Sequence, residues 1–127
     1  GSVFYRVMET TDNHSYDTKS EKIFVEFIQL VEKYCRKERR VSWYAQQLKL
    51  TPKYLSEIVS SVSKCSPNAW IDKYVTNEIR IMLRQTDMKI CDIAKELNFP
   101  NQSFLGKYFR ENVGISPIKY RKGMEGK

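Results

Sequence analysis

Apolar side chains between residues 20 and 36 recur at steps of three and four, the spacing that gathers them on one face of an α-helix. Ser20 precedes the run as a candidate N-cap, and Lys33, Arg36 and Lys37 suit the negative end of the helix dipole. The pattern therefore predicts a helix over residues 20–36. Its apolar stripe comprises Ile23, Phe24, Phe27, Ile28, Val31, Tyr34 and Cys35.

A pair of shorter helices is predicted next, interrupted by a turn. The first helix covers about residues 41–48, and the second begins after Thr51, a capping residue, with Pro52 at the first helical position. Two helices joined by a three- or four-residue turn have the outline of a helix-turn-helix unit. The sequence therefore places a first unit over about residues 41–60.

A second pair with the same outline is predicted near the C-terminus. Its first helix covers about residues 90–97 and is followed by Asn98, which tolerates left-handed turn geometry. Its second helix begins near Asn101 and is broken at Gly114. A second helix-turn-helix unit is therefore predicted over about residues 90–112.

A longer helix is predicted between the two units. Ser66 and Pro67 repeat the cap-and-proline signal, and apolar residues then occupy more than one side of the segment. One stripe comprises Ile71, Val75, Ile79 and Met82, and other faces carry Trp70, Tyr74 and Ile81. A helix that is apolar on several sides is typical of burial between two bodies, so residues 67–85 are predicted to form a rigid connector.

The second half of the chain repeats the order of signals in the first. Residues 41–45 align with residues 90–94 at an offset of 49, as do Leu48 and Leu97. Beyond the turn the offset is 50, and it pairs Leu55 with Leu105, Ser66-Pro67 with Ser116-Pro117, and Trp70 with Tyr120. The chain is therefore predicted to be all-α, with about seven helices forming two homeodomain-like helix-turn-helix subdomains joined by the connector.

Positive charge is concentrated in the last two thirds of the chain. The net charge is +7, but residues 1–38 contain six basic and seven acidic side chains, whereas residues 39–127 contain sixteen and eight. A basic chain favours an anionic partner, such as nucleic acid or an anionic membrane surface. A solvated, lysine-rich surface explains the same excess equally well, so charge alone does not decide between them.

Neither metal binding nor enzymatic chemistry is indicated by the sequence. Cys35, Cys65 and Cys91 are scattered, His14 is the sole histidine, and no four residues have zinc-ligand spacing. Such cysteines fit a reducing compartment, and we expect packing residues or inert thiols. Because the sequence has no Ser-His-Asp set and no glycine-rich phosphate loop, we expect no enzyme activity and no cofactor.

Residues 1–19 are predicted to be a tag remnant and linker, because Gly1-Ser2 resembles an expression scar and no clear period follows. The folded domain is expected over residues 20–127, as part of a longer protein. No apolar run reaches the roughly 18 residues that a membrane-spanning helix needs, and no signal peptide is visible. We therefore expect a cytoplasmic location and no membrane contact.

Three ordered motifs carry a family resemblance. Residues 90–99 (ICDIAKELNF) resemble I-x-E-I-A-x-x-x-G-F, residues 103–110 (SFLGKYFR) resemble S-x-F-x-R-x-F-K, and residues 114–121 (GISPIKYR) resemble G-x-T/S-P-x-x-Y-R. In this order and at this spacing, the motifs resemble the DNA-binding domain of the AraC/XylS family of bacterial regulators. The resemblance covers about residues 41–122.

The first unit departs from the family pattern at several positions. Lys49 occupies a position where a turn glycine is common, and Lys64 occupies the position of the glycine before Ser-Pro. Glu57 replaces the usual basic residue, and Ile58-Val59 replaces the usual aliphatic-phenylalanine pair. These departures bear on the strength of its DNA contacts and not on its fold.

Base contacts are expected from the second helix of each unit, because the major groove admits one helix and side chains near its N-terminus reach the base edges. The candidates in the first unit are Lys53, Ser56 and Glu57. The candidates in the second unit are Gln102, Ser103, Gly106 and Lys107. The side chains expected to face inward are Tyr54, Leu55, Ile58, Phe104, Leu105 and Phe109. The family resemblance places base-facing residues at the same candidate positions.

Phosphate contacts are expected from basic side chains at the edges of the units. The candidates are Arg39 and Arg40 near the first unit, and Arg110, Lys119 and Arg121 in the second. The connector is expected to hold the two recognition helices about 34 Å apart, one turn of DNA, so that they enter successive major grooves. Since the units differ in sequence, one chain is expected to bind an asymmetric site.

The resemblance implies double-stranded DNA as the partner of a transcription activator that also contacts RNA polymerase and carries a sensor domain this chain lacks. A protein-interaction module is the alternative, in which the helix over residues 20–36 docks a partner and DNA binding is weak or lost. Salt separates these hypotheses, because DNA binding weakens steeply with salt and a hydrophobic interface does not.

Overall fold

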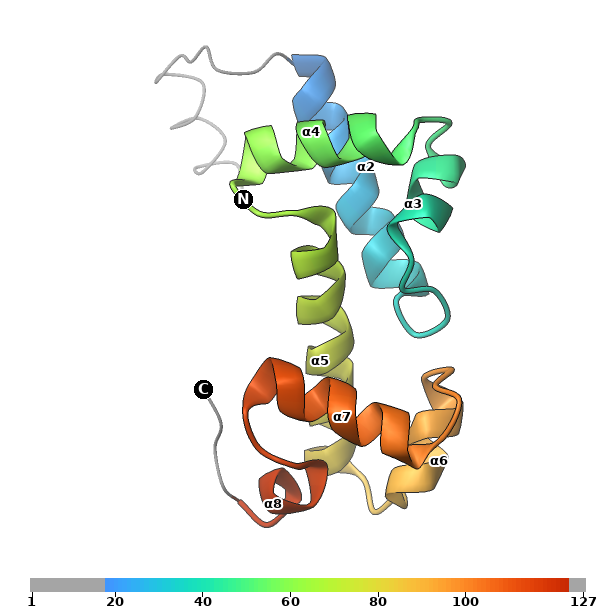
Figure 1. Cartoon of the computed structure of the whole chain (residues 1–127), viewed down its shortest axis with the longest axis vertical. Coiled ribbons are helices and arrows are strands. Elements are labelled where there is room, and N and C mark those ends of the chain that lie inside the picture. Colours follow the sequence, from blue (N-terminus) through green and yellow to red (C-terminus); the bar gives the residue numbers. More distant parts are fainter. Residues whose placement is uncertain (1–17, 124–127) are drawn as a thin grey trace.

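The computed structural model describes residues 18–123, and over this range the chain has seven helices and no strand (Figure 1). The helices are α2 (Thr18–Tyr34), α3 (Val41–Gln47), α4 (Pro52–Ser63), α5 (Pro67–Gln85), α6 (Ile90–Glu96), α7 (Gln102–Val113) and α8 (Pro117–Arg121). The predicted all-α class is confirmed. The segment predicted to be tag remnant and linker lies outside the described residues, except for its last two residues, which already belong to α2.

Side-chain caps determine where four of these helices begin. Thr51, Ser66, Asn101 and Ser116 each accept a hydrogen bond of 3.0–3.2 Å from the backbone N–H three residues later. Such a cap contributes about 1 kcal/mol, because it satisfies one of the orphan donors in the first turn. The predicted cap at Ser20 is wrong, since α2 is already helical two residues earlier.

A residue with left-handed backbone geometry follows each of the helices α3, α4, α6 and α7. Lys49 (φ 61°) comes after α3, and Asn98 (φ 61°) comes after α6 at the equivalent position. Lys64 (φ 67°) ends α4, and Gly114 (φ 101°) ends α7. The prediction for Asn98 is confirmed, and both lysines that replace family glycines adopt a conformation in which glycine carries no steric cost.

The packing of the helices is repeated. In the first unit, α2 packs against α3 and α4, these two pack against each other, and α5 packs against α2 and α4. In the second unit, α5, α6, α7 and α8 take the places of α2, α3, α4 and α5, with the same five packed pairs. Helix α5 therefore serves twice, as the last helix of the first unit and the first helix of the second (Figure 1).

Both units share one hydrophobic core. The predicted connector stripe of Ile71, Val75, Ile79 and Met82 is buried along α5, which confirms its phase. Trp70 packs edge-to-face against Phe24 of α2, with ring centroids 5.7 Å apart. The predicted burial between two bodies is confirmed, since α5 packs against the helices of both units, although Ile81 on another face is 36% exposed.

Candidate nucleic-acid interface

Helices α4 and α7 cross the same face of the molecule, one above the other, with α2 behind α4 and α5 behind α7 (Figure 1). Their first turns lie on the same side of that face, next to α3 and α6 (Figure 1). This arrangement follows from the repeat, because α4 and α7 are the equivalent helices of two units built on one plan.

The first turns of α4 combine one basic and one acidic side chain. Lys53 and Glu57 are exposed and Ser56 is half-buried, so all three predicted candidates reach the surface. Leu55 and Ile58 face the core, as predicted. The same prediction is wrong for Tyr54, which is the third residue of α4 and is 41% exposed.

The first turns of α7 contain no acidic side chain. Gln102, Ser103 and Lys107 are exposed, as predicted. Gly106 is half-buried, and a Cβ added there would meet no atom within 4 Å, so a partner can approach the backbone closely at this point.

The predicted inward set of α7 requires one correction. Leu105, Phe109 and Val113 are fully buried at steps of four. Phe104 is 57% exposed, so its predicted burial is wrong. The physical reason is phase, because the buried stripe passes through Leu105 and each residue turns the helix by about 100°.

A half-buried tyrosine anchors α7 to the connector. The Tyr108 hydroxyl donates a 2.6 Å hydrogen bond to Asp72 Oδ1 of α5. Burial and this hydrogen bond both raise the pKa of Tyr108, so the hydroxyl keeps its proton and the bond persists at any ordinary pH. The surface of α7 is thereby held in a fixed position on α5.

Three of the five predicted phosphate contacts lie at the surface. Arg110 and Lys119 are exposed in the second unit. Arg40 is exposed before α3, where it forms a 3.3 Å ion pair with Glu38. An exposed pair of this kind is weak, so the Arg40 guanidinium stays available to another anion.

Arg121 has a structural role that its sequence position did not reveal. Its guanidinium donates hydrogen bonds of 2.6–3.3 Å to four backbone carbonyls in and just after the last turn of α5, those of Met82, Leu83, Thr86 and Met88. The last carbonyls of a helix accept no hydrogen bond from the backbone of that helix, so they need another donor. A cation is also favourable at this end of the helix dipole. Arg121 therefore caps α5 and is not a free phosphate ligand.

Arg39 joins the two units. It donates hydrogen bonds to the carbonyls of Leu97 (2.7 Å) and Asn98 (2.6 Å), and its guanidinium lies 4.0 Å from the centre of the Phe99 ring. Asn98 Nδ2 donates in return to the carbonyl of Lys37 (2.8 Å). Partial burial lowers the pKa of Arg39, but the ordinary pKa of a guanidinium is so high that the side chain stays charged.

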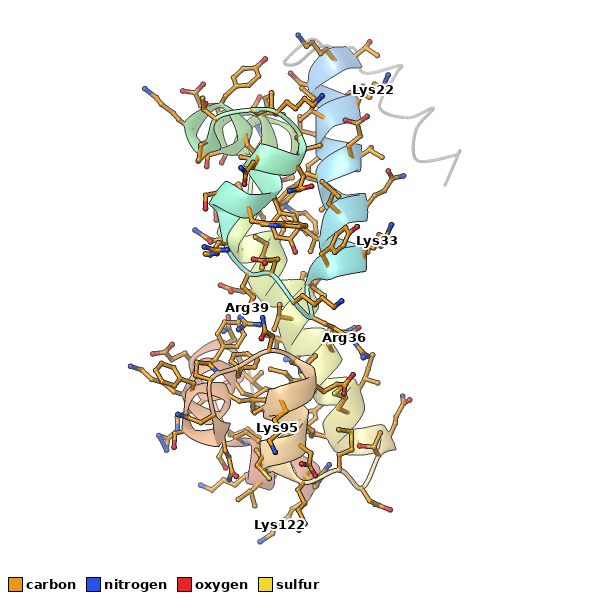
Figure 2. The ribbon with its side chains drawn as sticks, turned by 90° about the vertical axis from the view of Figure 1, so that its right-hand side faces the viewer. Lys22, Lys33, Arg36, Arg39, Lys95 and Lys122 are labelled. Carbon is orange, nitrogen blue, oxygen red and sulfur yellow. The ribbon has the colours of Figure 1, made fainter. Side chains whose placement is uncertain are left out.

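Arg36 adds a second link at the same level. It donates a 2.7 Å hydrogen bond to Glu78 of α5 and lies 3.9 Å from Glu96 of α6. Figure 2 shows Arg36 and Arg39 where the upper and lower units meet. We call the contacts of Arg36, Arg39 and Asn98 the waist contact. Sequence reasoning missed it, because nothing in the local pattern pairs Arg39 with a turn 58 residues away.

The apolar stripe of α2 is occupied by the chain's own core. Phe27, Val31 and Cys35 are buried, and the Phe27 ring packs edge-to-face against Tyr44 of α3. Burial raises the pKa of the Cys35 thiol to about 11, so this cysteine is the inert packing residue that was expected. Cys65 is exposed, which does not fit the expectation of a packing residue. The stripe proposed to dock a partner therefore already packs within the first unit.

Residues 18–123 contain neither a cluster of metal ligands nor a membrane-spanning helix. Within that range, no three His, Cys, Asp or Glu side chains gather as a metal site would require. None of the helices found there has the length and apolar character to cross a membrane.

Comparison with known proteins adds family information. A family profile described as "Helix-turn-helix domain" matches residues 44–123. The HTH-type transcriptional regulator ExsA of Pseudomonas aeruginosa is 31% identical over 102 residues, which are 80% of this chain and 37% of ExsA. The arabinose operon regulatory protein of Escherichia coli K12 is 26% identical over 65% of this chain and 28% of its own length. The chain thus spans about a third of the length of these relatives.

Solved structures share the fold. The C-terminal domain of AraT, a response regulator from Geobacillus stearothermophilus, superimposes with a TM-score of 0.75 at 22% identity, covering 83% of this chain and 88% of that domain. The DNA-binding domain of AdpA, a global transcriptional factor crystallised with a target DNA, gives a TM-score of 0.69 at 18% identity over 78% of this chain and 89% of its own.

Proposed function

This chain belongs to the AraC family of helix-turn-helix DNA-binding domains, which act in transcription regulation and are not enzymes, and on that premise we propose that it binds one specific duplex sequence with α4 and α7 together. The observation that carries the proposal is the placement of both helices on one face with their first turns on one side (Figure 1). A helix enters the major groove with side chains near its N-terminus directed at base edges, so two such helices can enter successive grooves about one turn, or about 34 Å, apart.

The exposed side chains of α7 are suited to direct base recognition. Gln102 can form two hydrogen bonds with adenine, and Lys107 can donate to the acceptor atoms of guanine. Ser103 can donate or accept, and the open surface at Gly106 allows close approach of the helix backbone.

The exposed side chains of α4 offer a more selective combination. Lys53 can donate to guanine, whereas Glu57 can only accept, for example from a cytosine amine. Ser56 is half-buried beside them. A carboxylate in the groove is repelled by nearby phosphates unless it finds a hydrogen-bond donor. The affinity of α4 for DNA of random sequence should therefore be lower than that of α7.

Phosphate contacts are proposed for the exposed basic side chains at the edges of the units, which are Arg40, Arg110 and Lys119. Such contacts fix the register of a protein on the duplex without reading its sequence. Because α4 and α7 differ in sequence and belong to one chain, we propose that one monomer occupies an asymmetric site.

The rest of the proposal concerns the longer protein. This domain spans about a third of the length of ExsA. We propose that another part of the protein senses a signal and that the whole protein acts in the cytoplasm as an activator that contacts RNA polymerase. The relatives support a regulatory role, since ExsA is named as a transcriptional regulator and AdpA as a transcriptional factor.

Selection from random duplex DNA tests the proposal. The bound pool is sequenced, the best site is footprinted, and its dissociation constant is measured at several salt concentrations. We expect one asymmetric site with two protected segments about one helical turn apart, one chain per duplex in sedimentation, and affinity that falls steeply with salt. An unenriched pool, or a strict need for two chains per site, would contradict the proposal.

A further inference from the structure

Each of the two proposed recognition helices displays an aromatic ring at the same place. Tyr54 is the third residue of α4 and Phe104 the third residue of α7, and the offset of 50 pairs them. Tyr54 is 41% exposed and Phe104 is 57% exposed. The caps Thr51 and Asn101 accept their hydrogen bonds from the backbone N–H groups of these two residues, so each ring is attached to a fixed first turn.

The two rings stand among polar neighbours. Gln102, Ser103 and Lys107 are exposed around Phe104 on α7. The other large apolar side chains exposed within residues 18–123 are Ile81 and Ile118, which belong to α5 and α8. A protein partner would favour a continuous apolar patch, whereas a lone ring on a polar helix suits a surface that is polar with isolated apolar groups.

The major groove of DNA is such a surface. Its base edges present hydrogen-bond donors and acceptors, and thymine adds a 5-methyl group that apolar side chains, phenylalanine among them, can contact. A ring at the third position of a recognition helix lies in the turn that enters the groove most deeply.

We propose that Phe104 and Tyr54 each contact the 5-methyl group of a thymine, so that each half of the binding site contains a thymine recognised by an aromatic ring. The inference rests on the proposed function, since it requires α4 and α7 to occupy the major groove. It adds a chemical class of contact, and a base, to the hydrogen bonds proposed for the polar side chains.

Deoxyuridine tests the contact, because it differs from thymidine only by the missing methyl group and keeps every hydrogen-bonding atom. Each thymine of the selected, footprinted site is replaced in turn, and the dissociation constant is measured at one salt concentration. For the parent chain we expect one sensitive thymine in each half of the site, with binding weakened about threefold to fivefold, as the loss of one buried methyl group implies.

Variants assign each sensitive thymine to its ring. Phe104→Ala should bind the thymine duplex about threefold to tenfold more weakly and lose the deoxyuridine effect in the half contacted by α7, while the other half keeps it. Tyr54→Ala should do the same for the half contacted by α4. Tyr54→Phe should retain the parent response, because the ring and not the hydroxyl makes the contact.

Ile118→Ala is the matched control, since it removes a side chain that is 53% exposed but lies on α8. It should bind like the parent and keep both deoxyuridine effects. Thermal melts of Phe104→Ala and Tyr54→Ala within a degree or two of the parent would show that any affinity change does not come from unfolding.

The possible failures are distinguishable. A pool without an enriched sequence would overturn the proposed function and this inference together. The inference alone would be overturned if every thymine of an enriched site could be replaced by deoxyuridine with less than a twofold change in the dissociation constant. It would also be overturned if Phe104→Ala kept the deoxyuridine effect in both halves of the site. Either result would leave the polar contacts in place.

Discussion

The two helix-turn-helix units fill equivalent core positions with different residues. The first unit has Tyr44 on α3 and Val59 on α4, whereas the second has Ile93 on α6 and Phe109 on α7, and all four side chains are fully buried. The large ring thus lies on the short helix in one unit and on the longer helix in the other. One packing plan is preserved because total volume is redistributed between neighbouring positions, which cores tolerate better than a net change.

Each large ring has its own aromatic support. Tyr44 packs edge-to-face against Phe27, at 5.8 Å between centroids, and its hydroxyl donates to the carbonyl of Glu38. Phe109 packs edge-to-face against Tyr120, at 5.4 Å. The first unit therefore depends on α2 for the partner of its ring, while the second depends on α8.

The largest effect is expected from removing a buried ring. Phe109→Ala should lower the free energy of unfolding by about 3–5 kcal/mol, because it leaves a cavity, whereas Val59→Ala should cost about 2 kcal/mol. Urea unfolding of both variants measures this difference. Phe104→Ala is the control, since its exposed ring should cost less than about 1 kcal/mol. Equal losses of unfolding free energy for Phe109→Ala and Val59→Ala would contradict the view that the larger buried ring of the second unit lies on α7.

The second contrast concerns DNA affinity. Lys107→Ala and Gln102→Ala should each weaken binding to the selected site by about 1–3 kcal/mol and relax preference at one or two base pairs. Glu57→Ala should cost little there and strengthen binding to unrelated duplexes, because a carboxylate no longer faces the phosphates. Titrations at one salt concentration measure all three. If Glu57→Ala loses more affinity than Lys107→Ala, the first unit is the main reader of sequence.

The smallest effect concerns the left-handed residues that end α4 and α7. Gly114→Ala should lower the free energy of unfolding by about 1 kcal/mol, since φ of 101° is unfavourable for any side chain. Lys64→Gly should raise it by about 0.5–1 kcal/mol, because φ of 67° is left-handed and lysine has a Cβ. Thermal melts compare the two, with Lys122→Gly as an exposed basic control. A loss of stability in Lys64→Gly would show that the lysine side chain makes a compensating contact.

Local signals in the sequence predicted most helix boundaries. The four cap residues determined where α4, α5, α7 and α8 begin, and the predicted connector coincides with α5. Such signals work because a capping side chain acts on a backbone group only three residues away. At the start of α2 the signal misled, because Ser20 resembles a cap in sequence but lies inside the helix, two residues after Thr18.

The sequence was less informative about which apolar residues of α7 face the core. Phe104, Leu105, Tyr108 and Phe109 together span about 140° of the helix circumference, which is wider than an apolar stripe of roughly 100°, so periodicity alone does not select the buried pair. Packing on α5 decides, and Phe104 remains outside. The candidate interface was therefore predicted in its polar members but not in its aromatic ones.

Long-range contacts could not be predicted at all. Arg39 and Arg121 were predicted to contact phosphates, yet both donate to backbone carbonyls of distant segments. The equivalence of α2 and α5 was also missed, because it lies in the packing order and not in matching residues.

The waist contact has a consequence for how a regulatory site can change. Under the proposed mode, Arg39 and Arg36 keep the two reading helices at one separation and one relative rotation. A base substitution in the operator then weakens one contact by a graded amount. An inserted base pair instead turns one half of the operator by about 35° relative to the other, since a helical turn holds 10–10.5 base pairs. Promoters served by this protein should therefore tolerate point mutations far better than single-base insertions or deletions between the two halves of the operator.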